Sequence, residues 1–199
     1  MKHSLVLSTA VMTFILATGN AVAQASGEGT KGPKQVVEEF LAMETNGGRL
    51  TPEGWRQADA FFARPAPEPS RRHIVVISPN YSVYETWTKG DQAQVYNDCE
   101  GLGQIDTALR YTPPESGVLK TTGVYRLVRT QEGVSPTSTI RSTEWKIEEP
   151  PTFLWLNKET AVRYVAEMRD KTSDPLVKKN ADRTLAVLRR HHGITPGAR

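Results

Sequence analysis

The chain has 199 residues and a formal net charge of +3 at pH 7, with 25 Lys and Arg against 22 Asp and Glu. This length accommodates one domain with a substantial core. Basic residues are not interleaved with aromatic ones in any block, so the composition gives no support to a nucleic-acid partner.

The first residues have the features of a Sec-type signal peptide: the positive charge of Lys2, an apolar run over residues 4–17, and small residues at Ala21 and Ala23. The run is shorter than the ~20 residues that a membrane span needs. We therefore expect cleavage after Ala23, with Ala25 as a second site and an uncleaved anchor as the competing interpretation. The mature protein is expected to be exported, periplasmic or secreted, and free of the membrane.

Residues 24–32 are polar and rich in glycine, which predicts a flexible leader. A helix is predicted to begin at Pro33, and a second at Pro52 with Thr51 as its N-cap. Apolar residues at helical spacing predict one buried face on each helix. These are Val36, Val37, Phe40 and Leu41 in the first helix, and Trp55, Ala58, Phe61 and Phe62 in the second.

The strands begin with residues 73–77, an almost continuous apolar run that predicts burial on both faces. Pro79 and Asn80 predict a break, after which residues 81–88 form a second strand. Lys89 and Gly90 predict a two-residue hairpin loop leading into a long arm over residues 92–106. Two glycines in that arm, Gly101 and Gly103, indicate a bulge or a sharp bend.

This hairpin loop fixes a predicted register, because side chains in paired strands alternate between faces. Two groups of residues then share a face each, and a slip by one residue would exchange them. The first pairs Trp87 with Gln92, Glu85 with Gln94, Val83 with Tyr96, and Tyr81 with Asp98; the second holds Tyr84, Thr86, Val95, Asn97 and Cys99.

Residues 121–130 and 142–149 predict two further strands, and the apolar residues 153–156 are expected to dock on the core. Asn157 and Asp174 predict the N-caps of two C-terminal helices. The predicted fold is α+β: two N-terminal helices on a curved antiparallel meander of about five strands, plus the C-terminal helix pair. The predicted boundaries are 1–23 for the signal peptide, 24–32 for the leader, 33–156 for the α+β domain and 157–192 for a helical hairpin packed on it.

Cys99 is the only cysteine, so the core has no internal disulfide to stabilise it. Its place in the middle of a strand predicts a small buried residue. An intermolecular disulfide or a reactive thiol is the alternative.

Motifs for metal binding or nucleophilic catalysis, such as H-E-x-x-H, C-x-x-C and G-x-S-x-G, are absent from the sequence. His191 and His192 are adjacent at a predicted helix end, where they complement the helix dipole rather than form a metal pair. We therefore expect neither a metal nor a cofactor. Asn80 begins an N-glycosylation triplet, which matters only in a eukaryotic secretory pathway.

The candidate catalytic residues are carboxylates and their aromatic neighbours. Asp98 and Glu100 are two apart in a strand, which places them on one face with their Cα atoms about 7 Å apart. In a pocket, loss of solvent would raise the pKa of one of them and make it a general acid or base together with Tyr84, Tyr96 or His73. On an outer face they would be ordinary solvated acids.

The candidate ligand-binding residues are aromatic or cationic: Tyr81, Trp87, Tyr96 and Arg126. Arg126 is expected on the strand beside the two acids, where it pairs with them or binds an anionic ligand.

Two helices, a proline-rich link and a strongly bent antiparallel meander resemble the nuclear transport factor 2-like (ketosteroid isomerase-like) cone fold over residues 33–149. The likeness lies in the helical stripes, the second helix and the long arm with its glycine bend. It departs from the family in lacking the short third helix and in having the C-terminal pair. The resemblance implies a pocket between helices and concave sheet that binds small ligands or performs proton transfer, or a module that dimerises.

The sequence thus supports a domain that binds a small molecule or a protein partner, with a homodimer left open. The alternative is a ketosteroid isomerase-like lyase, isomerase or hydrolase that uses a pocket carboxylate and a tyrosine. An assembly role for the C-terminal helices is a third hypothesis.

Overall fold

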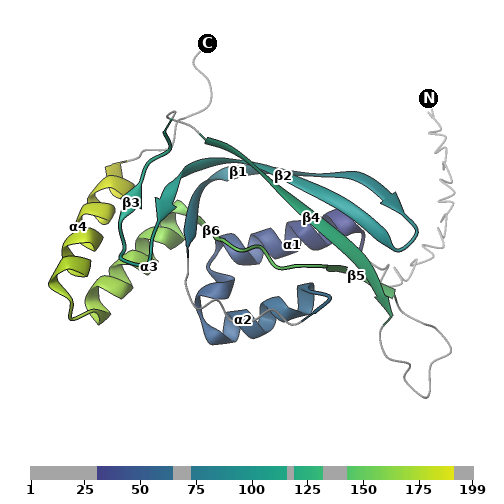
Figure 1. Cartoon of the computed structure of the whole chain (residues 1–199), viewed down its shortest axis with the longest axis horizontal. Helices are drawn as coiled ribbons and strands as arrows, with labels where there is room; N and C mark the ends of the chain where they lie inside the picture. The colour runs from purple at the N-terminus through teal and green to yellow at the C-terminus, as the bar shows by residue number, and fades with distance from the viewer. Residues whose placement is uncertain (1–30, 65–72, 116–118, 132–142, 191–199) are drawn as a thin grey trace, which may run out of the picture.

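The computed structural model describes residues 31–64, 73–115, 119–131 and 143–190 (Figure 1). The predicted signal peptide, most of the leader, and the two histidines at the C-terminal end lie outside these ranges. The elements are α1 Pro33–Thr45, η1 Gly48–Leu50, α2 Pro52–Ala58, η2 Asp59–Phe61, β1 Ile74–Lys89, β2 Gln92–Ile105, β3 Tyr111–Thr112, β4 Leu119–Gln131, β5 Thr143–Ile147, β6 Leu154–Asn157, α3 Lys158–Lys171 and α4 Pro175–Arg190.

The predicted α+β architecture is confirmed. The sheet has the order β5–β4–β2–β1–β6, with β3 paired to β2, and it curls into a half-barrel over α1 (Figure 1). Strands β1, β2, β4 and β5 form the predicted antiparallel meander. The segment predicted only to dock on the core is a further strand, β6, which pairs in parallel with β1 and begins at Leu154.

The four α-helices of the described residues begin where the sequence predicts, and three of them have the predicted side-chain cap. The Thr51 hydroxyl accepts a hydrogen bond from the backbone N–H of Gly54, 3.0 Å, and the Asn157 side chain accepts one from Thr160, 2.8 Å. Asp174 accepts one from Leu176, 2.7 Å. Each cap satisfies a donor at a helix start that has no partner within the helix.

The concave side of the sheet is filled by α1, whose apolar stripe is buried as the spacing predicts. Phe40 is at the centre, with ring centroids 5.4 Å from Phe62, 5.8 Å from Phe61 and 6.0 Å from Tyr125. The same core takes in Trp55 and residues from β2, β4 and β5.

The start of β1 is buried on both faces, as its continuous apolar run predicts. Ile74 and Val76 pack in one cluster with residues of α3 and α4, and Val75 and Ile77 pack in another with Cys99 and Trp155. The two C-terminal helices lie side by side at this end of the sheet, joined by an ion pair from Arg169 Nε to Asp182 Oδ1, 2.6 Å (Figure 1).

The predicted break at Pro79 and Asn80 is wrong, because β1 runs unbroken from Ile74 to Lys89. At these two residues it is the pairing of β1 with β2 that is irregular, with a register shift between Ile77 and Tyr81. The predicted glycine bulge is confirmed: Val76 pairs with Gly103 and Ile77 with Gly101, so one residue of β2 is left over.

The predicted hairpin register is also wrong. Lys89 pairs with Gln92, so the loop is Gly90–Asp91, with Gly90 in the left-handed region at φ +59°. Trp87 therefore pairs with Gln94, two residues from the predicted partner, and a further irregularity between Glu85 and Trp87 shifts the pairing back by one residue. Beyond it Tyr84 pairs with Tyr96 and Tyr81 with Cys99, which exchanges the faces predicted for the two tyrosines of β1.

An ion pair is buried beneath the end of α1. Arg49 donates to both carboxylate oxygens of Glu44, at 2.8 and 2.6 Å, and neither side chain is more than 1% exposed. The guanidinium also donates to the carbonyls of Pro151, 2.9 Å, and Phe153, 2.8 Å. Glu44 accepts the backbone N–H of Trp155, 3.2 Å. The pair thereby holds the chain entering β6 against α1.

Cys99 is expected to be unreactive in the folded protein. Burial, reinforced by the charge of Asp98, raises the pKa of the thiol from 9.0 to about 12. The thiolate is the reactive form, so at pH 8 native protein should react with an aromatic disulfide reagent at least about 100-fold more slowly than protein unfolded in guanidinium chloride. Equal rates would contradict this burial. Below pH 9 the thiol is neutral in both states and the stability of the fold is at its full value. As pH rises from 9 towards 12, the thiol ionises in the unfolded state but not in the folded state, so the stability falls.

Candidate functional site

Most of the predicted site residues meet on the face of the sheet that points away from α1. Alternation along β2 buries Ala93, Val95 and Asn97 and turns their neighbours outward. On this outer face the paired strands place side chains in rows across β1, β2 and β4. The central row is Tyr84, Tyr96 and Val124; the row to one side is Ser82, Asp98 and Thr122; and the row to the other side is Trp87, Gln94 and Arg126. We call these nine residues the outer-face patch.

The centre of the patch is a pair of stacked aromatic rings. Tyr84 and Tyr96 have centroids 5.8 Å apart and planes 11° apart. The Tyr84 hydroxyl donates to Asp98 Oδ2, 3.1 Å, and the Thr122 hydroxyl donates to Asp98 Oδ1, 2.7 Å. These contacts hold the carboxylate and both rings in fixed positions on an open surface.

A groove lies beside this centre, with a volume of about 350 Å³. Trp87 and Arg126 line it, together with Gln94, Val128 and Glu148. The indole N–H of Trp87 donates to Gln94 Oε1, 2.7 Å, which fixes the indole over the sheet. The irregularity before Trp87 is what brings it to this face, since strict alternation from Tyr84 would turn it inward.

Hydrophobic surface is concentrated on the patch. In the described part of the chain, three of the five large hydrophobic side chains that stay exposed belong to it: Val124 at 51%, Trp87 at 44% and Tyr84 at 40%. The other two, Phe153 and Leu176, lie elsewhere. Exposed apolar surface with a polar surround marks an interaction site.

The patch holds a carboxylate, that of Asp98, beside the phenol of Tyr84. Partial loss of solvent, the hydrogen bond to Asp98 and nearby negative charge all raise the pKa of Tyr84. The phenol therefore stays protonated and acts as a hydrogen-bond donor. Asp98 and Glu100 are both exposed to solvent.

Three of the predicted site residues, Tyr81, His73 and Glu100, lie outside the outer-face patch. Tyr81 faces the interior, where it packs against the core and burial raises its pKa. His73 precedes β1 and contacts Phe153, with ring centroids 6.4 Å apart. Glu100 lies on the outer side of β2 beyond the patch, paired with Lys120 of β4. The structure therefore does not assemble Tyr81 or His73 with the two acids.

A group of buried polar atoms on the concave side was not among the predicted site residues. Asn97 Oδ1, Thr121 Oγ1 and the Tyr125 hydroxyl have no hydrogen-bond partner among the described residues. Asn97 lies over Gly123, where a Cβ would be 2.0 Å from its Oδ1. The signal in the sequence was the asparagine in an otherwise apolar alternation. Burial raises the pKa of Tyr125 strongly, so its phenol stays neutral.

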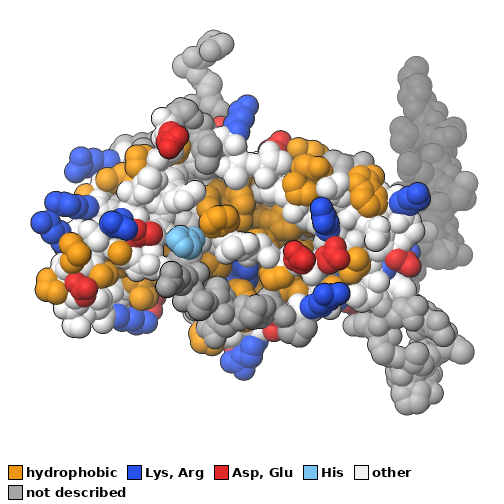
Figure 2. Space-filling model, in the orientation of Figure 1, with side chains coloured by type: hydrophobic (Ala, Val, Ile, Leu, Met, Phe, Trp, Pro, Cys, Tyr) orange, Lys and Arg blue, Asp and Glu red, His pale blue; other side chains and the backbone are white. Residues whose placement is uncertain are grey.

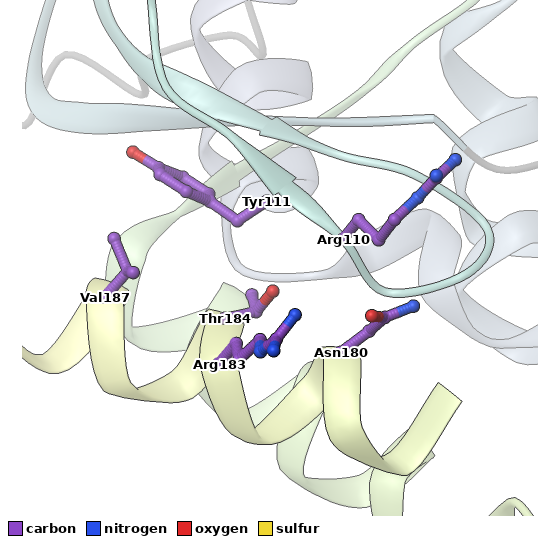
Figure 3. Close-up of a pocket in the computed structure, with 6 residues that line it drawn as sticks. All are labelled: Arg110, Tyr111, Asn180, Arg183, Thr184 and Val187. Carbon is purple, nitrogen blue, oxygen red and sulfur yellow. The ribbon is translucent and has the colours of Figure 1, made fainter. Parts of the chain in front are cut away.

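A second groove, of about 240 Å³, lies between α4 and the start of β3 (Figure 3). Two hydrogen bonds at this groove connect α4 to the loop before β3. Asn180 donates to the carbonyl of Ala108, 3.1 Å, and Thr184 donates to that of Leu109, 2.7 Å. Arg110 extends away from α4 in this view. Lys and Arg side chains gather at this end of the molecule (Figure 2). The groove thus belongs to the attachment of the C-terminal helices.

Across the described ranges, no group of three or more potential metal ligands comes together, and no helix has the length and hydropathy of a membrane span. No protein-family model, no curated protein and no solved structure matches the chain.

Proposed function

We propose that this chain is a non-catalytic binding module that takes a protein partner on the outer-face patch. The observation that carries the proposal is the concentration of exposed apolar side chains there, in rows that also hold Asp98 and Arg126. Aromatic and arginine side chains dominate the energetics of protein interfaces. The stacked tyrosines and the hydrogen-bonded indole lose little rotamer freedom on binding, because they are already held in place.

The setting we propose is an exported domain, periplasmic or secreted, because residues 1–23 have the pattern of a signal peptide. A curled half-barrel over helices is compatible with a nuclear transport factor 2-like origin, which we include in the proposal. A pocket for a small ligand is less well supported, since Phe40 and its neighbours fill the concave side. The enzymatic alternative needs a desolvated carboxylate beside a tyrosine, and the Tyr84–Asp98 pair is open to water.

The proposal predicts site-specific crosslinking. A photoreactive benzoylphenylalanine in place of Val124, in the full chain produced in cells, should give one discrete protein adduct that Arg126→Asp weakens about tenfold or more. The same probe in place of Leu176, which is 64% exposed and far from the patch in sequence, is the matched control and should give no such adduct. Equal labelling at both positions, or none at Val124, would refute the proposed interface.

A further inference from the structure

We infer that the partner on the outer-face patch is a second copy of this chain, placed by a two-fold axis that crosses the strands at the row of Tyr84, Tyr96 and Val124. The inference rests on the proposed function. It comes from the order of the three rows on the patch. When a second copy lies on the patch with its strands running in the opposite direction, each flanking row meets the other flanking row, and the two are complementary in size and charge.

Two copies of one sheet face can meet about a two-fold axis that lies in the interface. An axis across the strands reverses their direction, so each row meets the row at the same distance on the other side of the centre. The row of Ser82, Asp98 and Thr122 then faces the partner's row of Trp87, Gln94 and Arg126, and the central row faces itself.

The two rows that flank the central row differ in the size of their side chains. The row of Asp98 has small side chains on its outer strands, Ser82 on β1 and Thr122 on β4. The row of Gln94 has large side chains on the same two strands, Trp87 on β1 and Arg126 on β4. The indole therefore meets the hydroxymethyl group of a serine, and the guanidinium extends over a threonine. Large side chains opposite small ones let two surfaces interdigitate at the packing density of a protein interior.

The two flanking rows also carry opposite charges, one on Asp98 and one on Arg126. Asp98 and Arg126 lie two residues to either side of the central row, on the adjacent strands β2 and β4. After the two-fold rotation each carboxylate faces Gln94 of the other copy and has its Arg126 on the neighbouring strand, about 5 Å away. Two symmetric carboxylate–guanidinium pairs then flank the apolar centre of Tyr84, Tyr96 and Val124. Such pairing sets register and excludes the parallel arrangement, in which acids would face acids.

The test is a charge exchange in the purified full chain, followed by sedimentation velocity. The wild type should sediment as a dimer. Asp98→Arg and Arg126→Asp should each weaken self-association about tenfold or more, since each opposes like charges twice. An equimolar mixture of the two variants should restore the dimer, because each altered residue then meets its opposite charge.

Several results would overturn the inference: a monomeric wild type, single variants that dimerise as the wild type does, or a mixture that stays monomeric. A disulfide readout guards against a variant that folds poorly. Val124→Cys is next to the proposed axis and should form a disulfide with its own copy on mild oxidation, whereas Leu176→Cys should not; Cys99 is buried and does not compete. A monomeric wild type whose Val124 probe crosslinks to a different protein would overturn the second copy and leave the proposed function standing, while absence of any adduct would overturn both.

Discussion

Replacing Arg49 with methionine is expected to lower the free energy of unfolding by about 3–5 kcal/mol, the range for breaking a buried ion pair by removing one partner. The substitution leaves the Glu44 carboxylate, which has no exposed side-chain surface, without its counter-charge. It also leaves the carbonyls of Pro151 and Phe153 without their donor. The guanidinium lies 5.6 Å from the centroid of Phe40 and 5.1 Å from that of Trp55, so packing is lost as well.

Guanidinium chloride unfolding followed by tryptophan fluorescence measures this change. Arg56→Met is the matched control, because Arg56 is 72% exposed and pairs with Glu53 on the surface of α2. It should change stability by only about 0–1 kcal/mol. A double variant, Glu44→Leu with Arg49→Met, should recover part of the loss, since no charge is then left buried. If Arg49→Met were as mild as the control, the pair would not be what holds β6 to α1.

Replacing Phe40 with alanine is expected to cost about 3–5 kcal/mol, the range for truncating a buried phenylalanine. Phe40 is fully buried and touches the rings of Phe61, Phe62 and Tyr125. Its removal opens a cavity where α1 meets the concave sheet, and the curled strands around it cannot collapse to fill the space. Thermal unfolding followed by circular dichroism measures the effect.

Phe153→Ala serves as the control for this second substitution. Phe153 is 42% exposed and makes its ring contact with His73, so its loss should change stability by less than about 1 kcal/mol. A small effect at Phe40 would mean that the concave side is open rather than packed, and would return support to a ligand pocket between α1 and the sheet.

The outer-face patch shows how a local irregularity decides a site. The sequence predicts two faces for the hairpin, and assigns Tyr81 with Asp98 to one and Tyr84 to the other. The one-residue shift between Glu85 and Trp87 exchanges the tyrosines and keeps Trp87 outside. Because side chains alternate with a period of two, a single extra residue reverses the face of every position beyond it.

The buried ion pair of Arg49 and Glu44 is a feature that the sequence did not predict, for a different reason. Arg49 sits between Gly48 and Leu50 just after α1, where a cation in a turn is ordinarily solvated. Its burial depends on Pro151 and Phe153, which are about a hundred residues later in the chain and supply carbonyl acceptors. A pattern that repeats over a few residues carries no information on a contact of that range.

The sequence by itself determined what depends on neighbouring residues: the caps at Thr51, Asn157 and Asp174, the apolar stripe of α1, the doubly buried start of β1 and the α+β class. Each of these follows from a short-range preference or a period of 3.6 or 2 residues. Only the tertiary structure decided the strand register, the parallel addition of β6, the burial of Arg49 and the gathering of Tyr84, Tyr96, Asp98, Trp87 and Arg126 on one exposed face. Those outcomes depend on how distant segments pair, and pairing is settled by the packing of the whole sheet against its helices.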